Sequence, residues 1–265
     1  MAVGQHVRAH APLIIRTNVM SSRSGFRFSL CIVLAVVMLF VFQSCSLVSA
    51  STLSADPIDS QVVDADTGKP IHGVIVVAYW ELHQGSLGGD ALPCAAANVE
   101  EAVTDKDGKF HVPGWGPIKG HCGYMRGGDP LMFIFKPGYY YNQYPNTPYG
   151  TDIVTVTHNG WKGRQMKLKK FPDVSYSDMS PTAYIWNVSQ FNIALSFITD
   201  FPTQCIWRRV PNTLRTLELE GEKFRKALGY PVGVITGQLI TNDKWFEKVA
   251  PQCGSPKVFL EGLMK

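Results

Sequence analysis

The chain has 265 residues, which is enough for one or two domains with a sizeable hydrophobic core. It carries 25 basic and 21 acidic residues, yet no acidic residue precedes Asp56. The basic residues of the first fifty positions are Arg8, Arg16, Arg23 and Arg27. The rest of the chain has 21 residues of each sign and no formal net charge. The positive charge belongs to the N-terminal segment, which argues against nucleic-acid binding through an extended basic field.

Residues 1–50 have the layout of a signal segment: basic residues, an apolar run from Leu30 to Phe42, and small residues before position 51. The run is shorter than the roughly 20 residues that a bilayer-spanning helix needs. We therefore predict an exported protein of a bacterial envelope, located in the periplasm or associated with the outer membrane.

Two maturation sites compete within this segment. Val48-Ser49-Ala50 places small residues at the −3 and −1 positions of an ordinary signal peptidase site. Phe42-Gln43-Ser44-Cys45 instead resembles a lipobox, which makes Cys45 a lipidation candidate and gives the mature protein a possible membrane tether. The sequence leaves both alternatives open.

Four cysteines remain beyond the leader. An even number in an oxidising compartment predicts two disulfides, and three connectivities are possible. We favour pairing within each apparent half of the chain. The two predicted pairs are Cys94 with Cys122 and Cys205 with Cys253.

After an expected linker at 51–57, residues 58–170 are typical of a β-sandwich with short strands between turns. The segment from Gly73 to Trp80 is too apolar to have one solvent-exposed face, so we expect a strand that is covered on both sides. We expect an insertion from His83 to Asn98 that contains Cys94. Asp105-Lys106-Asp107-Gly108 predicts a hairpin turn.

In residues 171–265 the apolar residues recur with a helical period. We expect this helical extension to pack on the sandwich. Ser180-Pro181 is a helix start with Pro at the first helical position. A clearer amphipathic helix runs from Val210 to Leu228 and is ended by Gly229. A last helix is expected at about Asn242–Ala250.

Three motifs resemble the carboxypeptidase regulatory-like family, which is also called transthyretin-like. They span about residues 58–170: a valine-rich strand with a Thr67-Gly68-Lys69-Pro70-Ile71 turn, Thr104-Asp105 leading to Gly108 and Phe110, and Lys136-Pro137-Gly138-Tyr139. The resemblance implies a seven-stranded, Ig-like sandwich and no catalytic residues. The insertion around Cys94 and the helical extension depart from the family pattern.

The sequence predicts no enzyme, metal site or cofactor. A zinc carboxypeptidase needs a His-x-x-Glu pair, and no His in this chain is followed by Glu at the third position. Gln252-Cys253-Gly254-Ser255 faintly resembles the nucleophile segment of a cysteine protease, but no His follows Cys253 to act as the base. Asp105 and Asp107 lie in a loop too short for an EF-hand, so a turn is favoured over a calcium site.

Aromatic residues crowd one stretch and supply the candidate ligand-binding site. Exposed rings interleaved with amides stack on sugars or bind protein partners. The candidate residues are Tyr139, Tyr140, Tyr141, Tyr144, Tyr149 and Trp115. The alternative is that about half of these rings pack beneath a long loop.

Three functional hypotheses follow. The first is a non-catalytic binding or interaction module whose partner is an envelope protein or a glycan. The second is a structural accessory lipoprotein held at a membrane through Cys45. The third is an unrecognised enzyme or carbohydrate-binding protein, for which the sequence supplies no constellation of reactive side chains.

Overall fold

The computed structural model describes six segments, which all belong to one compact unit, Ala50–Lys265. The segments are residues 52–85, 91–120, 122–147, 152–172, 181–229 and 235–265. The leader, with Cys45 and the residues before position 51, lies outside them. None of the helices in these segments is long and apolar enough to cross a membrane.

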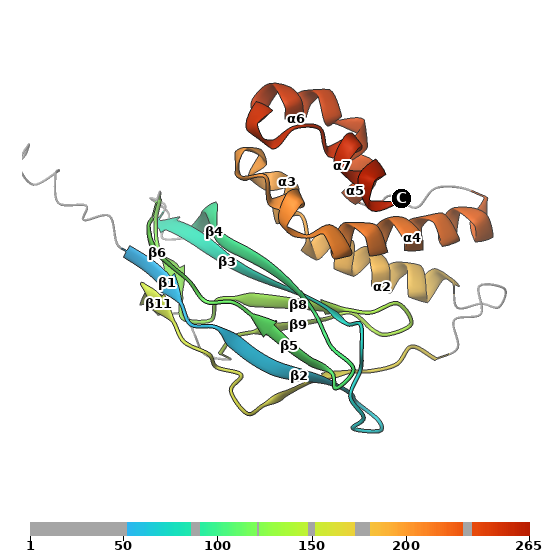
Figure 1. The fold of residues 1–265 in the computed structure, drawn as a ribbon, viewed down its shortest axis with the longest axis horizontal. Coiled ribbons are helices and arrows are strands. Elements are labelled where there is room, and N and C mark those ends of the chain that lie inside the picture. Colours follow the sequence, from blue (N-terminus) through green and yellow to red (C-terminus); the bar gives the residue numbers. More distant parts are fainter. Residues whose placement is uncertain (1–51, 86–90, 121, 148–151, 173–180, 230–234) are drawn as a thin grey trace, which may run out of the picture. The chain divides into compact units, whose positions relative to one another are not determined.

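Two facing sheets form a β-sandwich (Figure 1). The central sheet is antiparallel, has the order β4-β3-β8-β9, and consists of Ile75–Gly85 (β3), Ala91–Val103 (β4), Leu131–Phe135 (β8) and Asn142–Pro145 (β9). The second sheet has the order β12-β2-β5 and consists of Ile58–Asp64 (β2), Lys109–Val112 (β5) and Gln165–Leu168 (β12). These two sheets contain seven of the twelve strands in the described residues.

Strand β3 is buried on both faces, as its sequence predicts. Its alternate residues Val76, Ala78 and Trp80 point into the core between the two sheets. Tyr79 and its neighbours of the same parity point into a second core, which the helices complete. Side chains alternate across a strand with a period of two, so a strand covered on both sides must be apolar at nearly every position.

Two small sheets flank the sandwich, and one of them corrects the expected linker at 51–57. Within it, Thr52–Ala55 is strand β1, which lies between Trp115–Lys119 (β6) and Val156–Thr157 (β11). The segment is too short to show a period, and its partners lie more than fifty residues away. The other small sheet pairs Met125–Arg126 (β7) with Ile153–Val154 (β10).

The expected insertion and the expected hairpin are also wrong. The expected insertion at His83–Asn98 instead belongs largely to a long hairpin, because β3 continues to Gly85 and β4 begins at Ala91. The Asp105–Gly108 turn joins strands of different sheets, since β4 pairs with β3 and β5 pairs with β2. Gly108 has φ +70° and donates its N–H to Asp105, so this turn is tight without being a hairpin.

Residues 181–265 form the helical extension, which covers the free face of the central sheet (Figure 1). Its α-helices are Pro181–Ala194 (α2), Phe197–Asp200 (α3), Pro211–Leu228 (α4), Ile235–Thr241 (α5), Asp243–Val249 (α6) and Pro256–Leu263 (α7). Short 3-10 turns occupy Pro202–Gln204 (η1), Ile206–Arg209 (η2) and Pro251–Cys253 (η3). The expected fold class, a mainly β sandwich with a helical C-terminal extension, is confirmed.

The ends of α4 agree with the sequence. Pro211 occupies the first turn, where its missing N–H costs nothing, and Gly229 ends the helix with φ +74°. The buried side is formed by Leu214, Leu217 and Phe224. The helix expected at 242–250 is α6.

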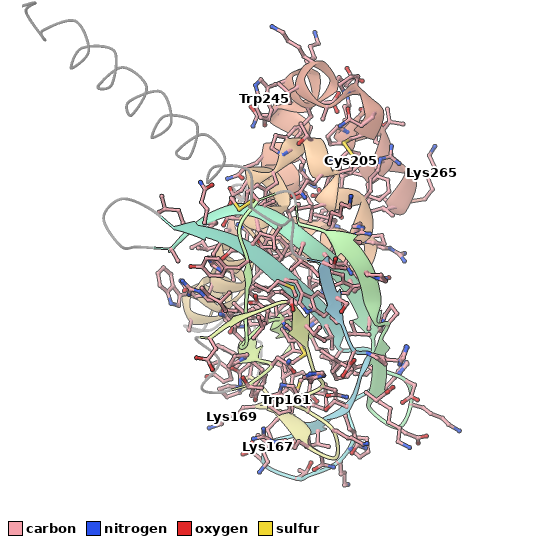
Figure 2. All side chains as sticks on the ribbon, turned by 90° about the vertical axis from the view of Figure 1, so that its left-hand side faces the viewer. Trp161, Lys167, Lys169, Cys205, Trp245 and Lys265 are labelled. Carbon is pink, nitrogen blue, oxygen red and sulfur yellow. A yellow bond between two sulfur atoms is a disulfide. The ribbon has the colours of Figure 1, made fainter. Side chains whose placement is uncertain are left out.

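Each region contains one disulfide. Cys94 is joined to Cys122 within the sandwich, and Cys205 to Cys253 within the helical extension (Figure 2). This is the pairing that the sequence analysis favours. Two disulfides indicate a protein that folds outside the reducing cytoplasm.

Candidate functional site

The tyrosine segment follows β8 and runs into β9, and most of its described rings are half-buried. The ring of Tyr141 packs 5.3 Å from that of Phe191 on α2. Tyr144 donates its hydroxyl to the carbonyl of Lys167 at 2.8 Å and packs edge-on against Trp161. Burial raises the pKa of Tyr139, Tyr141 and Tyr144. These three rings therefore help to build the fold.

The other members of the predicted site do not complete an exposed patch. Tyr140 is 38% exposed, but it leans on Phe171 with ring centroids 4.5 Å apart. Trp115 packs edge-on against buried Trp80 at the other core. Tyr149 lies outside the described residues. The described residues do not form the continuous exposed aromatic site that the sequence predicts, because Tyr139 and Tyr144 pack against the core between the two sheets and Tyr141 packs against the core that the helices complete.

A side-chain amide on α2 fixes this segment to the helical extension. Asn187 accepts the N–H of Tyr141 at 2.8 Å and donates to the carbonyl of Tyr139 at 3.0 Å. The amide thus supplies the donor and acceptor that another strand would supply. Asn187 is 8% exposed, so loss of its side chain would leave backbone groups buried without partners.

The opposite edge of the central sheet is held in the same way. Gln204 of η1 accepts the N–H of Ala96 at 2.9 Å and donates to its carbonyl at 2.8 Å. Farther along β4, the Glu101 carboxylate accepts the backbone N–H groups of Asn212 and Thr213 at the start of α4. A carboxylate at this end of a helix satisfies free N–H groups and complements the helix dipole. Both edges of the sheet therefore position the helices.

A buried polar network joins α2 to α4. Tyr184 donates its hydroxyl to the carboxylate of Glu220 at 2.9 Å and accepts the N–H of Gly138 at 3.0 Å. Lys223 also donates to Glu220. Glu220 is 1% exposed, and a buried carboxylate needs such partners. The network gives α2 a defined rotation, which determines the side chains that α2 turns outward.

The largest exposed aromatic side chains of the described residues lie on the helical extension. Trp186 on α2 is 65% exposed and Trp245 on α6 is 49% exposed. In Figure 2, Trp245 lies among the helices, whereas Trp161, which is buried, lies in the sandwich. Exposed tryptophan is enriched at the centres of protein interfaces. The outer side of the extension is therefore the better candidate surface.

Helix α2 differs from an ordinary surface helix. Its fourteen residues include no charged side chain, and its apolar residues are spread around the axis. One side packs into the core through Tyr184, Val188 and Phe191, while Trp186 and Ile193 remain exposed on the other. A helix that is apolar all round normally has partners all round. The outer side of α2 lacks such a partner in the chain described here.

A hollow lies at the end of the extension, between α4, α5 and α7. It has a volume of about 420 Å³. Apolar Ile240, Leu260 and Met264 line it together with charged side chains of both signs. A groove of this kind accommodates an apolar side chain, and its mixed charges specify no one ligand class.

The strongest cluster of titratable groups lies at the far end of β3. The Glu81 carboxylate accepts the hydroxyl of Tyr79 at 2.8 Å and lies 3.3 Å from Nε2 of His83. Burial lowers the pKa of His83, which favours its neutral form. Burial also raises the pKa of nearby Asp129 to about 7, although its carboxylate accepts the N–H of Arg126.

This cluster is better explained by the fold than by catalysis. Asp129 closes the turn that leads into β8. Tyr79 stacks on Phe197 with ring centroids 4.0 Å apart, so its ring belongs to the core. Within the described segments, no group of three or more His, Cys, Asp or Glu side chains is arranged to hold a metal ion.

The other candidate ligands also have local roles. Asp105 accepts the N–H groups of Asp107 and Lys109 and so forms its turn. His111 and His158 contact Asp59 and Asp56 at 2.8 Å in exposed pairs. Exposed pairs of this kind contribute little to stability.

No protein-family model matches the chain, and no curated protein matches it. Solved structures resemble part of it at low identity. A 3-chlorocatechol 1,2-dioxygenase from Rhodococcus opacus 1CP is 15% identical over 46% of this chain and 62% of its own, with a TM-score of 0.28. The pilus 2b backbone protein of group B streptococcus is 14% identical over 44% and 42%, with a TM-score of 0.23.

The dioxygenase domain of a carbohydrate-binding fusion protein from Streptomyces sp. SirexAA-E is 16% identical. It matches over 48% of this chain and 84% of its own, with a TM-score of 0.25. The chain spans less than two thirds of the length of the first two structures. With TM-scores this low, none of these likenesses carries an argument about activity.

The exposed side of α2 is not among the residues predicted from the sequence. The signal was present, because Trp186 and Ile193 lie seven residues apart in a helix whose start was recognised. A spacing of seven places both on one side of a helix. Without the rotation of α2, the sequence does not say whether that side faces the sheet or solvent.

Proposed function

We propose that this chain is an exported, non-catalytic interaction module. A transthyretin-like sandwich serves as the scaffold, and the helical extension presents the binding surface to a protein partner. The observation that carries the proposal is the exposure of Trp186 on a helix without charged residues. Exposed apolar surface around a rigid aromatic side chain supplies most of the binding energy in protein interfaces.

The construction of the extension supports this assignment. Asn187, Gln204 and Glu101 hydrogen-bond the helices to the sheet at separate points, and these bonds keep the outer surface rigid. A rigid surface loses little conformational entropy on binding. The tyrosine segment is engaged in the fold, which argues for a protein partner on the helices over a glycan on the strands.

Site-specific photo-crosslinking tests this proposal. A photoreactive amino acid at position 186 should yield a discrete protein adduct in intact cells. The same residue at position 140, the exposed member of the tyrosine segment, should not. Denaturing electrophoresis and mass spectrometry would identify the adduct. Crosslinks from 140 alone, or none from either position, would contradict the proposal.

Anchoring through Cys45 is the finer part of the localisation, and we propose it as an addition to the binding role. Its support is the position of Ser44-Cys45 directly after the apolar run. A Cys45→Ala variant should then move from the membrane fraction to the soluble fraction. Intact mass of the mature protein would separate a lipid on Cys45 from cleavage after Ala50, and unchanged fractionation of the variant would rule out the anchor.

A further inference from the structure

We infer that the outer side of α2 is a two-fold self-association surface, so that the partner is a second copy of this chain. The inference rests on the proposed function and names the partner at the same site. The surface, called the α2 seam below, consists of Ala183, Trp186, Gln190 and Ile193. Ala183 and the two large apolar residues are exposed, and Gln190 is partly exposed.

The spacing of the α2 seam is that of a helix-pairing stripe. Its members follow at intervals of three, four and three residues, which is the alternation of the a and d positions in a heptad. Three are apolar, and Gln190 supplies one polar group near the middle. A single polar residue in such a stripe selects register and partner at some cost in affinity.

The arrangement is self-complementary when two copies pair antiparallel. Trp186 and Ile193 lie about 10 Å apart along the helix, and their midpoint falls beside Gln190. A two-fold axis at that midpoint places Trp186 of each copy against Ile193 of the other. The two Gln190 amides then lie close to the axis, where each is able to donate to and accept from the other.

The absence of charge on α2 permits pairing with a second copy and argues against two other occupants. Because α2 contains no charged residue, pairing it with itself brings no like charges together on the helix. A helix that lies on a membrane surface typically has Lys or Arg on its polar side, and α2 has none. A strongly charged protein partner would find no opposite charge on the helix.

The size of the surface predicts a reversible contact. A single helix of fourteen residues buries less area than a stable standard-size interface. Self-association is therefore expected to depend on concentration. Tethering many copies to one membrane would raise their local concentration and favour the pair.

Replacing Gln190 with residues of either charge, and measuring association by sedimentation equilibrium, tests the inference. Wild-type protein should self-associate reversibly. Gln190→Glu and Gln190→Lys should each associate at least about tenfold more weakly, because two like charges meet near the axis. An equimolar mixture of the two variants should recover the association as a mixed pair. Recovery on mixing requires residue 190 of one copy to meet residue 190 of another.

Trp245→Ser is the matched control, since it removes an exposed tryptophan from α6 and leaves the α2 seam intact. It should associate like wild type. Circular dichroism checks that each variant is folded. Wild-type protein that stays monomeric up to about 1 mM, or a mixture that does not recover, overturns the inference.

The crosslinking experiment distinguishes failure of self-association from failure of the proposed interaction module. An adduct at position 186 with twice the mass of the chain supports a second copy. An adduct with another protein, together with monomeric wild-type protein, keeps the interaction module and overturns self-association. The absence of any adduct at 186 contradicts both.

Discussion

The two faces of the central sheet are both buried, but different interactions hold their coverings in place. On one face, the second sheet packs on Val76, Trp80 and Met132 of the central sheet, and the turns between the sheets fix the alignment. On the other face, the helices pack through aromatic rings such as Phe191 and are aligned by side-chain hydrogen bonds from Asn187 and Gln204. Helices that pack on a sheet form no backbone ladder with it, so directional side-chain hydrogen bonds fix their position.

This difference has a consequence for function. The second sheet exposes a polar outer face, with Gln61, Lys109 and Gln165 among its outward side chains. The helical layer instead leaves Trp186 and Ile193 exposed. Single apolar side chains such as Leu92 and Ile153 are exposed on the sandwich as well, but the two most exposed tryptophans of the described residues, Trp186 and Trp245, both lie on the helical layer.

The largest expected effect tests whether the two coverings form one cooperative unit. Phe191→Ala on the helix side should lower the free energy of unfolding by about 3–5 kcal/mol, and Met132→Ala on the sandwich side by about 2–5 kcal/mol. Both residues are fully buried. Urea unfolding should show a single transition that each variant shifts. Two separate transitions, each sensitive to one variant, would show that the extension folds independently.

The next effect tests the bonds that align the helices. Glu101→Ala removes a carboxylate that accepts four hydrogen bonds from Asn212 and Thr213. We expect a loss of about 2–3 kcal/mol in urea unfolding, because the first N–H groups of α4 lose their acceptor. Glu222→Ala, at an exposed ion pair on the same helix, is the control and should change stability by less than about 0.5 kcal/mol. Equal effects would argue against the capping role.

A smaller, pH-dependent effect arises at the end of β3. Burial raises the pKa of Asp129 to about 7, above the unfolded value of 3.8. An acid shifted in this direction stabilises the fold at pH below about 4, and this stability is lost as the pH rises through 7. Asp129→Asn should be more stable than wild type at pH 8, by about 1–3 kcal/mol, and the difference should vanish near pH 4.

Thermal unfolding of Asp129→Asn and wild type across this range measures the effect. His83 acts in the opposite sense, since burial lowers its pKa and favours the fold at higher pH. Comparison of the two proteins at each pH isolates Asp129. A constant difference between them would show that Asp129 keeps the same charge in the folded and unfolded states.

The smallest effect on stability is expected at Trp186. Because its side chain is 65% exposed, Trp186→Ser should change the free energy of unfolding by less than about 0.5 kcal/mol. The same variant should lose self-association in sedimentation experiments. Large destabilisation would mean that Trp186 supports the fold, and the account of the α2 seam would then fail.

Local patterns predicted much of the fold. The apolar run in β3 indicated a strand covered on both sides, and Pro211 and Gly229 mark the ends of α4. The sequence did not reveal strand β1, whose partners β6 and β11 lie far along the chain. It also placed the tyrosines on a common surface, although Tyr141 packs against the helices while Tyr139 and Tyr144 pack against the core between the two sheets.

The candidate site was less accessible to sequence reasoning. Trp186 and Ile193 have helical spacing, but Tyr184 and Phe191 on the same helix are also large and apolar. Which pair is buried depends on the rotation of α2. The bonds of Asn187 to Tyr139 and Tyr141 fix that rotation, and they join residues more than forty positions apart.

Fluorine NMR of protein labelled with 5-fluorotryptophan tests most directly whether the chain binds through α2. Assignment needs one Trp→Phe variant for each resonance compared. As protein concentration rises, the account predicts that the resonance of Trp186 moves while those of Trp245 and Trp115 stay in place. A stationary Trp186 resonance beside a moving Trp115 resonance would contradict it and place the contact on the sandwich.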